Sequence, residues 1–230
     1  MEINFNRNGL VLNTDMFHTR VMATTTNRRR YDSSRRRAMA EDNRAAVLEA
    51  AAKLFATRGW ATGMRDVAKL AKVSVETVYA TAGNKAELLL KVIDIGIVGD
   101  DEPVPLSERP EWRALGEGDR AQRVAAVALQ IATSNQRIAA LNRTFAHAAS
   151  ADATLAERWD VYETRQREQY AAGTRMVLGR RASQDVVDGI WALGSAEVYL
   201  HLTETAGWSS EKYHHWLAER IDQLLPEEKS

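Results

Sequence analysis

Cysteine is absent from this 230-residue chain, and helix-breaking residues are scarce, with 4 Pro and 13 Gly. Without cysteine the chain forms no disulfide scaffold, no cysteine-ligated zinc site and no thiol nucleophile. No run approaches the roughly 18–20 uncharged apolar residues that span a bilayer, and the first apolar run, Leu10–Leu12, is too short for a signal-peptide core. We therefore expect a cytoplasmic protein with no membrane partner. Long tracts of Ala, Leu, Glu and Arg predict an all-α fold.

Charge is balanced over the whole chain but unevenly placed along it. There are 31 basic and 31 acidic residues; residues 1–98 hold 16 and 10 of them, a net of +6, and residues 99–230 hold 15 and 21, a net of −6. Six arginines fall within ten positions, at 28–30 and 35–37. This distribution predicts that only the N-terminal part meets a polyanion.

Two features divide the chain into three segments. Residues 1–40 have no sustained apolar periodicity and are predicted to form a flexible basic arm; Met22 and Met39 are alternative initiators, which leaves open whether residues 1–21 are translated. The acidic, Pro-punctuated run 99–105 is the other feature. It predicts a first helical domain over 41–98 and a second over 99–226.

The first helical domain has the pattern of a helix-turn-helix unit. A helical apolar stripe ends at Gly59, and short helices are predicted over 64–71 and 74–81 with a tight turn between them. Asp66, Ser74 and the pair Asn84 and Glu87 stand where helix caps belong. Further helices are predicted over 84–98, 119–133, 135–149, 152–179, 183–206 and 209–225.

From Arg44 the chain reads RAAVLEAAAKLFATRGWATGMRDVAKLAKVSVETVYATAGNKAELL. This resembles the N-terminal DNA-binding domain of the TetR family of bacterial transcriptional regulators over roughly residues 41–98. Lys72 stands where the family has a turn glycine, so we expect a non-glycine residue at positive φ, at about 1 kcal/mol. The resemblance implies an all-α homodimer, an N-terminal helix-turn-helix domain followed by a helical bundle that dimerises.

The resemblance also implies the function and the partners. The implied function is sequence-specific binding to an inverted-repeat operator in double-stranded DNA, with repression relieved by an unidentified small-molecule effector. An activator, a helical ligand-binding protein and a small-molecule enzyme that has lost its DNA role are the alternatives. The residues predicted to meet DNA are Thr62, Gly63, Arg65, Ser74, Val75, Glu76, Thr77, Tyr79, Ala80, Thr81 and Lys85, with Arg35, Arg36 and Arg37 from the arm.

Side-chain chemistry suggests a role for several of these positions. Val75 and Ala80 can meet thymine methyl groups and Glu76 can accept from a cytosine amine, or Glu76 is simply solvent-exposed. Thr77, Tyr79 and Lys85 match the family's phosphate-contact positions, and Tyr79 has a second interpretation as a core residue. The arm either enters an A·T-rich minor groove or is a solubilising tail.

The second domain carries the predicted effector pocket and dimer interface. An aromatic stripe on the 152–179 helix, together with nearby histidines, predicts an apolar pocket with a few polar groups, or else ordinary core packing. The pocket set is Phe145, His147, Trp159, Tyr162, Gln166 and His201. Two apolar seams on the 183–206 helix predict dimerisation, or burial on two sides of a monomer; the interface set is Trp191, Gly194, Ser195, Val198, Leu202, Tyr213, Trp216 and Leu217.

Catalytic patterns are missing from the sequence. The five histidines form no i, i+4 pair, and no HExxH, GxSxG or P-loop pattern occurs. We therefore expect no enzymatic activity, no metal and no cofactor.

Overall fold

A computed structural model describes residues 26–99 and 108–227, which are helical throughout their regular structure and include no strand. The chain divides between Ala40 and Glu41 into two units, residues 1–40 and residues 41–230, and each is described by itself. Over the described ranges no helix is long and apolar enough to cross a membrane. The predicted all-α class is confirmed.

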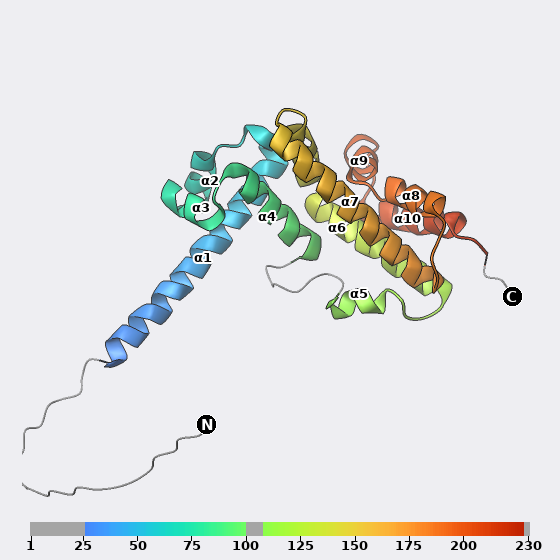
Figure 1. The fold of residues 1–230 in the computed structure, drawn as a ribbon, viewed down its shortest axis with the longest axis horizontal. Coiled ribbons are helices and arrows are strands. Elements are labelled where there is room, and N and C mark those ends of the chain that lie inside the picture. Colours follow the sequence, from blue (N-terminus) through green and yellow to red (C-terminus); the bar gives the residue numbers. More distant parts are fainter. Residues whose placement is uncertain (1–25, 100–107, 228–230) are drawn as a thin grey trace, which may run out of the picture. The chain divides into compact units, whose positions relative to one another are not determined.

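The N-terminal helices of Figure 1 follow one another with short connections. They are α1 (Thr26–Arg58), the 3-10 turn η1 (Gly59–Ala61), α2 (Met64–Ala71), α3 (Val75–Ala82) and α4 (Lys85–Val98). The body consists of α5 (Pro110–Ala114), α6 (Arg120–Ala149), α7 (Ala153–Leu178), α8 (Gln184–Leu193), α9 (Ala196–Leu200), the π-helical turn η3 (His201–Thr205) and α10 (Ser210–Leu224).

Helix α1 begins earlier than the sequence indicated. Residues 26–40, predicted to be part of a flexible arm, are helical, whereas residues 1–25 lie outside the described part. No Gly or Pro occurs in Thr26–Arg58, and the arginines and alanines that dominate it are good helix formers. The first half of α1 has no continuous apolar stripe, so the periodicity of apolar residues did not indicate it.

Helix α6 is the centre of the body and packs against α4, α7, α9 and α10. It is one continuous helix where the sequence predicted two, because no Gly or Pro interrupts it. Figure 1 shows α6 and α7 running side by side.

The predicted helix 183–206 is instead broken after Leu193. Gly194 ends α8, and Ser195 begins α9 by accepting a hydrogen bond from the Val198 backbone at 3.3 Å. Five residues of π-helix then follow, a local geometry that often marks functional positions.

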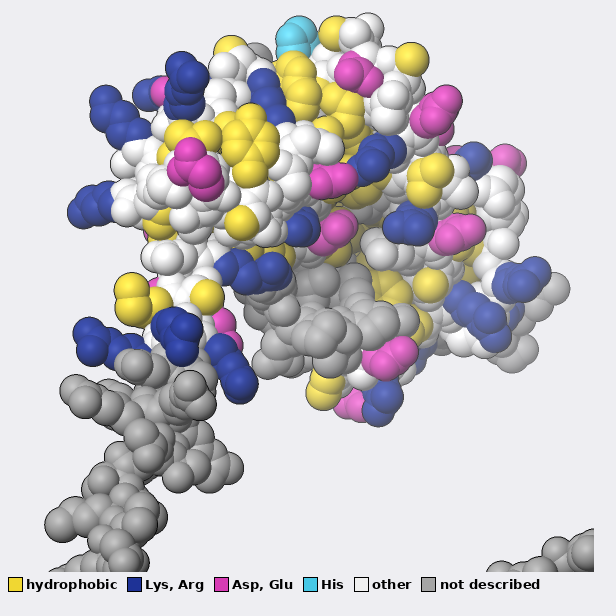
Figure 2. Space-filling view, turned by 60° about the vertical axis from the view of Figure 1, so that its left-hand side comes forward, with side chains coloured by type: hydrophobic (Ala, Val, Ile, Leu, Met, Phe, Trp, Pro, Cys, Tyr) yellow, Lys and Arg dark blue, Asp and Glu magenta, His cyan; other side chains and the backbone are white. Residues whose placement is uncertain are grey.

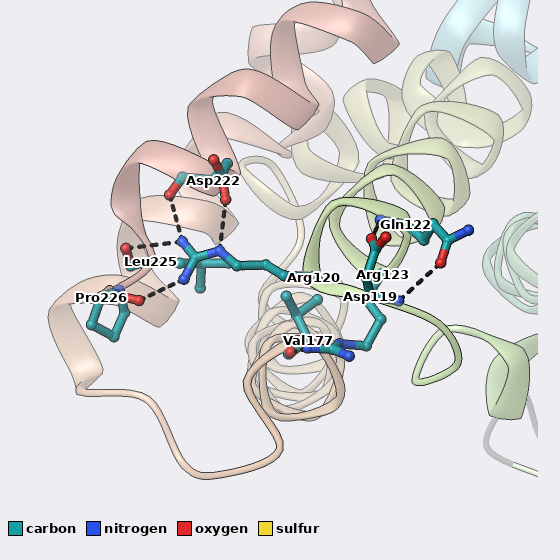
Figure 3. Close-up of polar contacts among 8 residues, drawn as sticks. All are labelled: Asp119, Arg120, Gln122, Arg123, Val177, Asp222, Leu225 and Pro226. Carbon is teal, nitrogen blue, oxygen red and sulfur yellow. Dashed lines mark hydrogen bonds and ion pairs between the residues drawn. The ribbon is translucent and has the colours of Figure 1, made fainter. Parts of the chain in front are cut away.

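Two arginines near the start of α6 bind the ends of neighbouring helices (Figure 3). Arg120 pairs with Asp222 at 2.8 Å and also donates to the carbonyls of Asp222, Leu225 and Pro226, which α10 leaves without helical partners. Arg123 donates to the Val177 carbonyl at the end of α7 at 2.9 Å. These contacts fix three helices of the body at one end.

The buried apolar side chains of residues 41–230 form two clusters. One joins α1–α4 to the far end of α6 through Leu141 and Phe145, and the other lies among α6, α8 and α10 around Tyr213 and Leu217. The first cluster packs the N-terminal helices against α6.

Candidate functional site

The turn between α2 and α3 is built from local hydrogen bonds. Lys72 adopts φ 57°, the positive φ that was predicted because Lys72 stands where the family has a turn glycine. The Val73 amide donates to the Ala68 carbonyl at 3.1 Å. The Asp66 carboxylate accepts from the Gly63 amide at 3.1 Å, and Ser74 accepts from the Thr77 amide at 3.2 Å. The predicted caps are confirmed, and they set the angle between α2 and α3.

Helix α3 has one buried and one open face. Val78 and Ala82 are buried against the other N-terminal helices, while Tyr79 is 50% exposed and Glu76 and Ala80 are exposed beside it. Val75, Thr77 and Thr81 are half-buried at the edges of this face, and Arg65 is exposed on α2. The open face of α3 thus offers methyl groups, a carboxylate and a phenol to a partner.

Glu76 places a negative charge on that face. Its pKa is lowered by a hydrogen bond from its own backbone and by another from Ser74, so it is ionised at neutral pH. In Figure 2, Lys and Arg side chains are interspersed with acidic and hydrophobic ones over the face shown. Complementarity to a polyanion therefore depends on particular residues and not on one uniform basic patch.

Lys85 is held at the start of α4 by Trp60. Its ammonium donates to the Trp60 carbonyl and lies 4.0 Å from the centre of the indole ring, and burial lowers its pKa. Asn84 and Glu87 form the predicted reciprocal cap, with the Glu87 amide donating to the Asn84 side chain at 2.9 Å. A charged side chain and a helix N-terminus, both suited to an anion, therefore lie together.

Thr62 lies elsewhere than predicted. It was expected on the DNA-facing surface, but it is 1% exposed and its hydroxyl donates to the Leu54 carbonyl at 3.0 Å. Thr144 of α6 donates in the same way to the Phe55 carbonyl at 2.8 Å. Both hydroxyls donate to carbonyls in the last two turns of α1, and Thr144 ties α1 to α6. Because Thr144 is distant in sequence, nothing in the local pattern indicated it.

The three arm arginines Arg35, Arg36 and Arg37 are exposed residues of α1 and belong to the other unit, residues 1–40.

Residues 47–92 match the family model described as bacterial regulatory proteins, tetR family. The chain carries a TetR-family regulatory domain. The match covers the end of α1, η1, the α2–α3 pair and the first half of α4. Its presence supports a DNA-binding transcriptional regulator of the TetR family. No match to a curated protein is found.

The body of the chain contains a cavity of about 550 Å³ among α4–α9. Trp159, Tyr162 and Gln166, predicted as pocket residues, line it from α7. Phe145 lies behind this wall, 0% exposed, with its ring 5.0 Å from Trp159 and 5.8 Å from Tyr162 between centroids. The volume falls in the range of sites for small organic ligands.

The two histidines of the predicted pocket are not part of the cavity wall. His147 and His201 are both exposed, His147 near the end of α6 and His201 in the π-helical turn. Their inclusion in the predicted pocket was therefore wrong. The cavity wall reaches no further along α6 than Asn142, short of His147, and His201 lies in a π-helical turn that sequence spacing did not indicate.

A chain of hydrogen bonds orders the polar groups on one wall of the cavity. The Gln166 amide donates to the Tyr162 hydroxyl at 2.9 Å, and that hydroxyl donates to the Asn142 side chain at 2.9 Å. Burial is the main cause that raises the pKa of Tyr162, so it is a neutral phenol. Asn142 comes from α6, and the sequence analysis did not single it out.

The break between α8 and α9 is stabilised from across the cavity. The Tyr170 hydroxyl and the Asn135 amide both donate to the Gly194 carbonyl, at 2.6 and 2.8 Å, and the Tyr213 hydroxyl donates to the Leu193 carbonyl at 3.1 Å. A Cβ at Gly194 would lie 2.6 Å from the Tyr170 hydroxyl. Gly194 therefore makes room for Tyr170 of the same chain, whereas the sequence analysis assigned it to the dimer interface.

Several of the predicted dimer-interface residues face the chain's own interior. Tyr213 and Leu217 are 0% exposed in the core between α6 and α10, so their assignment to a surface interface was wrong; the repeating apolar positions of α10 are the same for either use. Trp191 lines the cavity and Ser195 caps α9. The remaining predicted interface residues, Val198, Leu202 and Trp216, are half-buried.

Proposed function

We propose that this TetR-family regulator is a cytoplasmic homodimer that represses transcription from an inverted-repeat operator and is released by a small molecule. The observation that carries the proposal is that one helix, α4, contacts both the cavity and the helix-turn-helix pair α2–α3. Ile97 near the end of α4 lines the cavity, and the start of α4 follows α3 after a two-residue turn.

The cavity end of α4 lies very close to α6. A Cβ at Gly96 would lie 2.4 Å from the Cγ2 atom of Ile138, which also lines the cavity, and Arg137 donates to the Ile97 carbonyl at 3.3 Å. A ligand that displaces Ile97 or Ile138 must therefore move the end of α4, because close-packed interiors transmit small displacements.

The other end of α4 is tied to the recognition helix. The Lys91 ammonium donates to the Thr81 carbonyl in the last turn of α3 at 2.7 Å, and Leu88 and Leu89 are 0% exposed in the core that α3 shares. Movement of α4 is thus passed to α3. In a dimer it changes the separation of two recognition helices, which must lie about one DNA turn, ~34–36 Å, apart.

The open face of α3 supplies the proposed base contacts. Val75 and Ala80 meet thymine methyl groups and Glu76 accepts from a cytosine amine, while Thr77, Tyr79 and Lys85 bind phosphates. Half-buried apolar side chains of α9, η3 and α10 supply the proposed dimer surface, with Leu224 of α10 37% exposed beside them.

The test is reciprocity between the two sites. A ligand found by thermal-shift screening is titrated by calorimetry into the protein with and without its operator, the operator having been selected from random DNA. We expect the ligand to bind more weakly to the DNA complex, by the same factor by which it weakens operator affinity. Equal ligand affinities would reject release by that ligand, and tight ligand binding by a protein without operator affinity would favour the ligand-binding or enzyme alternative.

A further inference from the structure

The cavity has charge of one sign only. Glu163 of α7 and Glu197 of α9 are the two charged side chains in its wall, and no Lys, Arg or His of the described residues lines it. Its surface is otherwise made of aromatic and aliphatic side chains, amides, two serines and tyrosine hydroxyls. A ligand in this cavity meets two carboxylates and no compensating cation.

Neither carboxylate has a partner within the described part of the chain: no hydrogen bond or ion pair reaches Glu163 or Glu197. Burial raises the pKa of Glu163, and the negative charges of Glu197 and Asp160 raise it further. The nearby guanidinium of Arg167 lies 5.9 Å from the Trp191 ring, but it is paired with Asp188 at 2.5 Å. Glu163 is half-buried and Glu197 is exposed at the edge of the cavity wall, and no cation of the described residues neutralises either of them.

Aromatic rings surround the same space. Trp112, Trp159, Tyr162, Tyr170 and Trp191 line the cavity from α5, α7 and α8. The face of an aromatic ring attracts a cation, and this attraction grows when water is excluded. Paired carboxylates and several ring faces are complementary to a positively charged centre on a bulky apolar body.

We infer that the effector is an amphipathic organic cation, whose charge lies between Glu163 and Glu197 and whose apolar body packs on the aromatic rings. This inference rests on the proposed effector function and names the ligand class for the same cavity. An organic anion would add a third negative charge to the cavity, and a neutral ligand would leave the half-buried Glu163 without a counter-charge, whereas the exposed Glu197 adds attraction for a cation.

Phenyl-substituted probes of different charge test the inference, and the cation and the anion among them are matched in shape. Tetraphenylphosphonium is the cation, triphenylphosphine oxide the neutral compound and tetraphenylborate the anion, each titrated by calorimetry into the full chain without DNA. We expect tetraphenylphosphonium to bind at least about tenfold more tightly than the other two, as one added charge–charge attraction in a partly buried site implies. Equal affinities for the three probes, or no binding of the cation, would overturn the inference.

Substitutions locate the charge. Glu163→Gln and Glu197→Gln should each weaken tetraphenylphosphonium binding by roughly tenfold and change triphenylphosphine oxide binding less than about twofold. Glu168→Gln is the matched control, because Glu168 is an exposed carboxylate on α7 that does not line the cavity, and it should leave both affinities unchanged. Circular dichroism checks that each variant is folded. Equal losses in all three variants would place the cation on the surface and would contradict the inference.

Operator release is measured separately with the same three probes. A cation that binds through the two glutamates but leaves operator affinity unchanged would support the ligand class and contradict the proposed release mechanism. Release by the neutral probe or the anion, without binding of the cation, would support release and overturn the ligand class.

Discussion

Adding a methyl group at Gly96 tests the close approach of α4 to α6. A Cβ there would lie 2.4 Å from Cγ2 of Ile138, a side chain that is 3% exposed and cannot move freely away. Gly96→Ala therefore forces α4 and α6 apart or drives Ile138 from its rotamer. Either response disturbs the contact that we propose transmits ligand binding.

The magnitude follows from two opposing effects. Overpacking a buried contact costs about 1–3 kcal/mol, and replacing Gly by Ala inside a helix gains about 0.5–1 kcal/mol. The net change in the free energy of unfolding should lie between about zero and 2.5 kcal/mol of destabilisation. Ile138→Leu removes the clashing Cγ2 branch at equal volume and should by itself cost less than about 1.5 kcal/mol.

A double-mutant cycle isolates the contact. Urea unfolding of the wild type, both single variants and the double variant, at one protein concentration, should give a coupling energy of about 1–3 kcal/mol, with Gly96→Ala stabilising a chain that already carries Ile138→Leu. Operator affinity measured on the same four proteins should fall most in Gly96→Ala. A coupling energy near zero, with Gly96→Ala stabilising the wild type, would refute the close approach of α4 and α6.

Three further predictions concern other parts of the chain. Lys72→Gly should stabilise the protein by up to about 1 kcal/mol, since glycine adopts positive φ without strain. The control Lys69→Gly, inside α2, should destabilise the protein by about as much. Thermal unfolding measures both changes in stability, and stabilisation by both substitutions would contradict the prediction. Deletion of residues 1–38 should weaken operator binding and reduce the salt slope by roughly 0.9 for each phosphate no longer neutralised, whereas an unchanged slope and affinity would show that the arm does not touch DNA. Because the folded-state pKa of Glu163 is raised, its ionised form destabilises the fold at pH 7, and this unfavourable contribution disappears as the pH falls through that pKa. Glu163→Gln should therefore raise Tm relative to Glu168→Gln at pH 7. The gain in Tm should vanish in acid.

The helix-turn-helix unit could be predicted well because its determinants are local. The caps at Ser74 and Asn84 and the positive φ of Lys72 each follow from residues a few positions apart. Such short-range hydrogen bonds are formed whatever the rest of the chain does, so sequence alone identifies them.

Contacts between distant segments could not be predicted in the same way. Thr144 reaches the end of α1 across 89 positions, and Asn135 reaches Gly194 across 59. The buried Tyr213 shows the converse problem, because an apolar helix face reads the same whether it packs on α6 or on a second copy of the chain. The cavity likewise depends on a break at Gly194 that the sequence pattern left inside one helix.

Sequence-specific reading of DNA by α3 is tested best by selecting bound sequences from a random DNA pool. We expect an inverted repeat with half-site centres about one DNA turn apart, roughly 10–10.5 base pairs, or a multiple of it. Glu76→Gln should relax the preference at one position in each half-site, and Glu168→Gln on α7 should leave the selected sequence unchanged. Failure to enrich any sequence, or enrichment of a single non-palindromic site bound by a monomer in light scattering, would contradict the account.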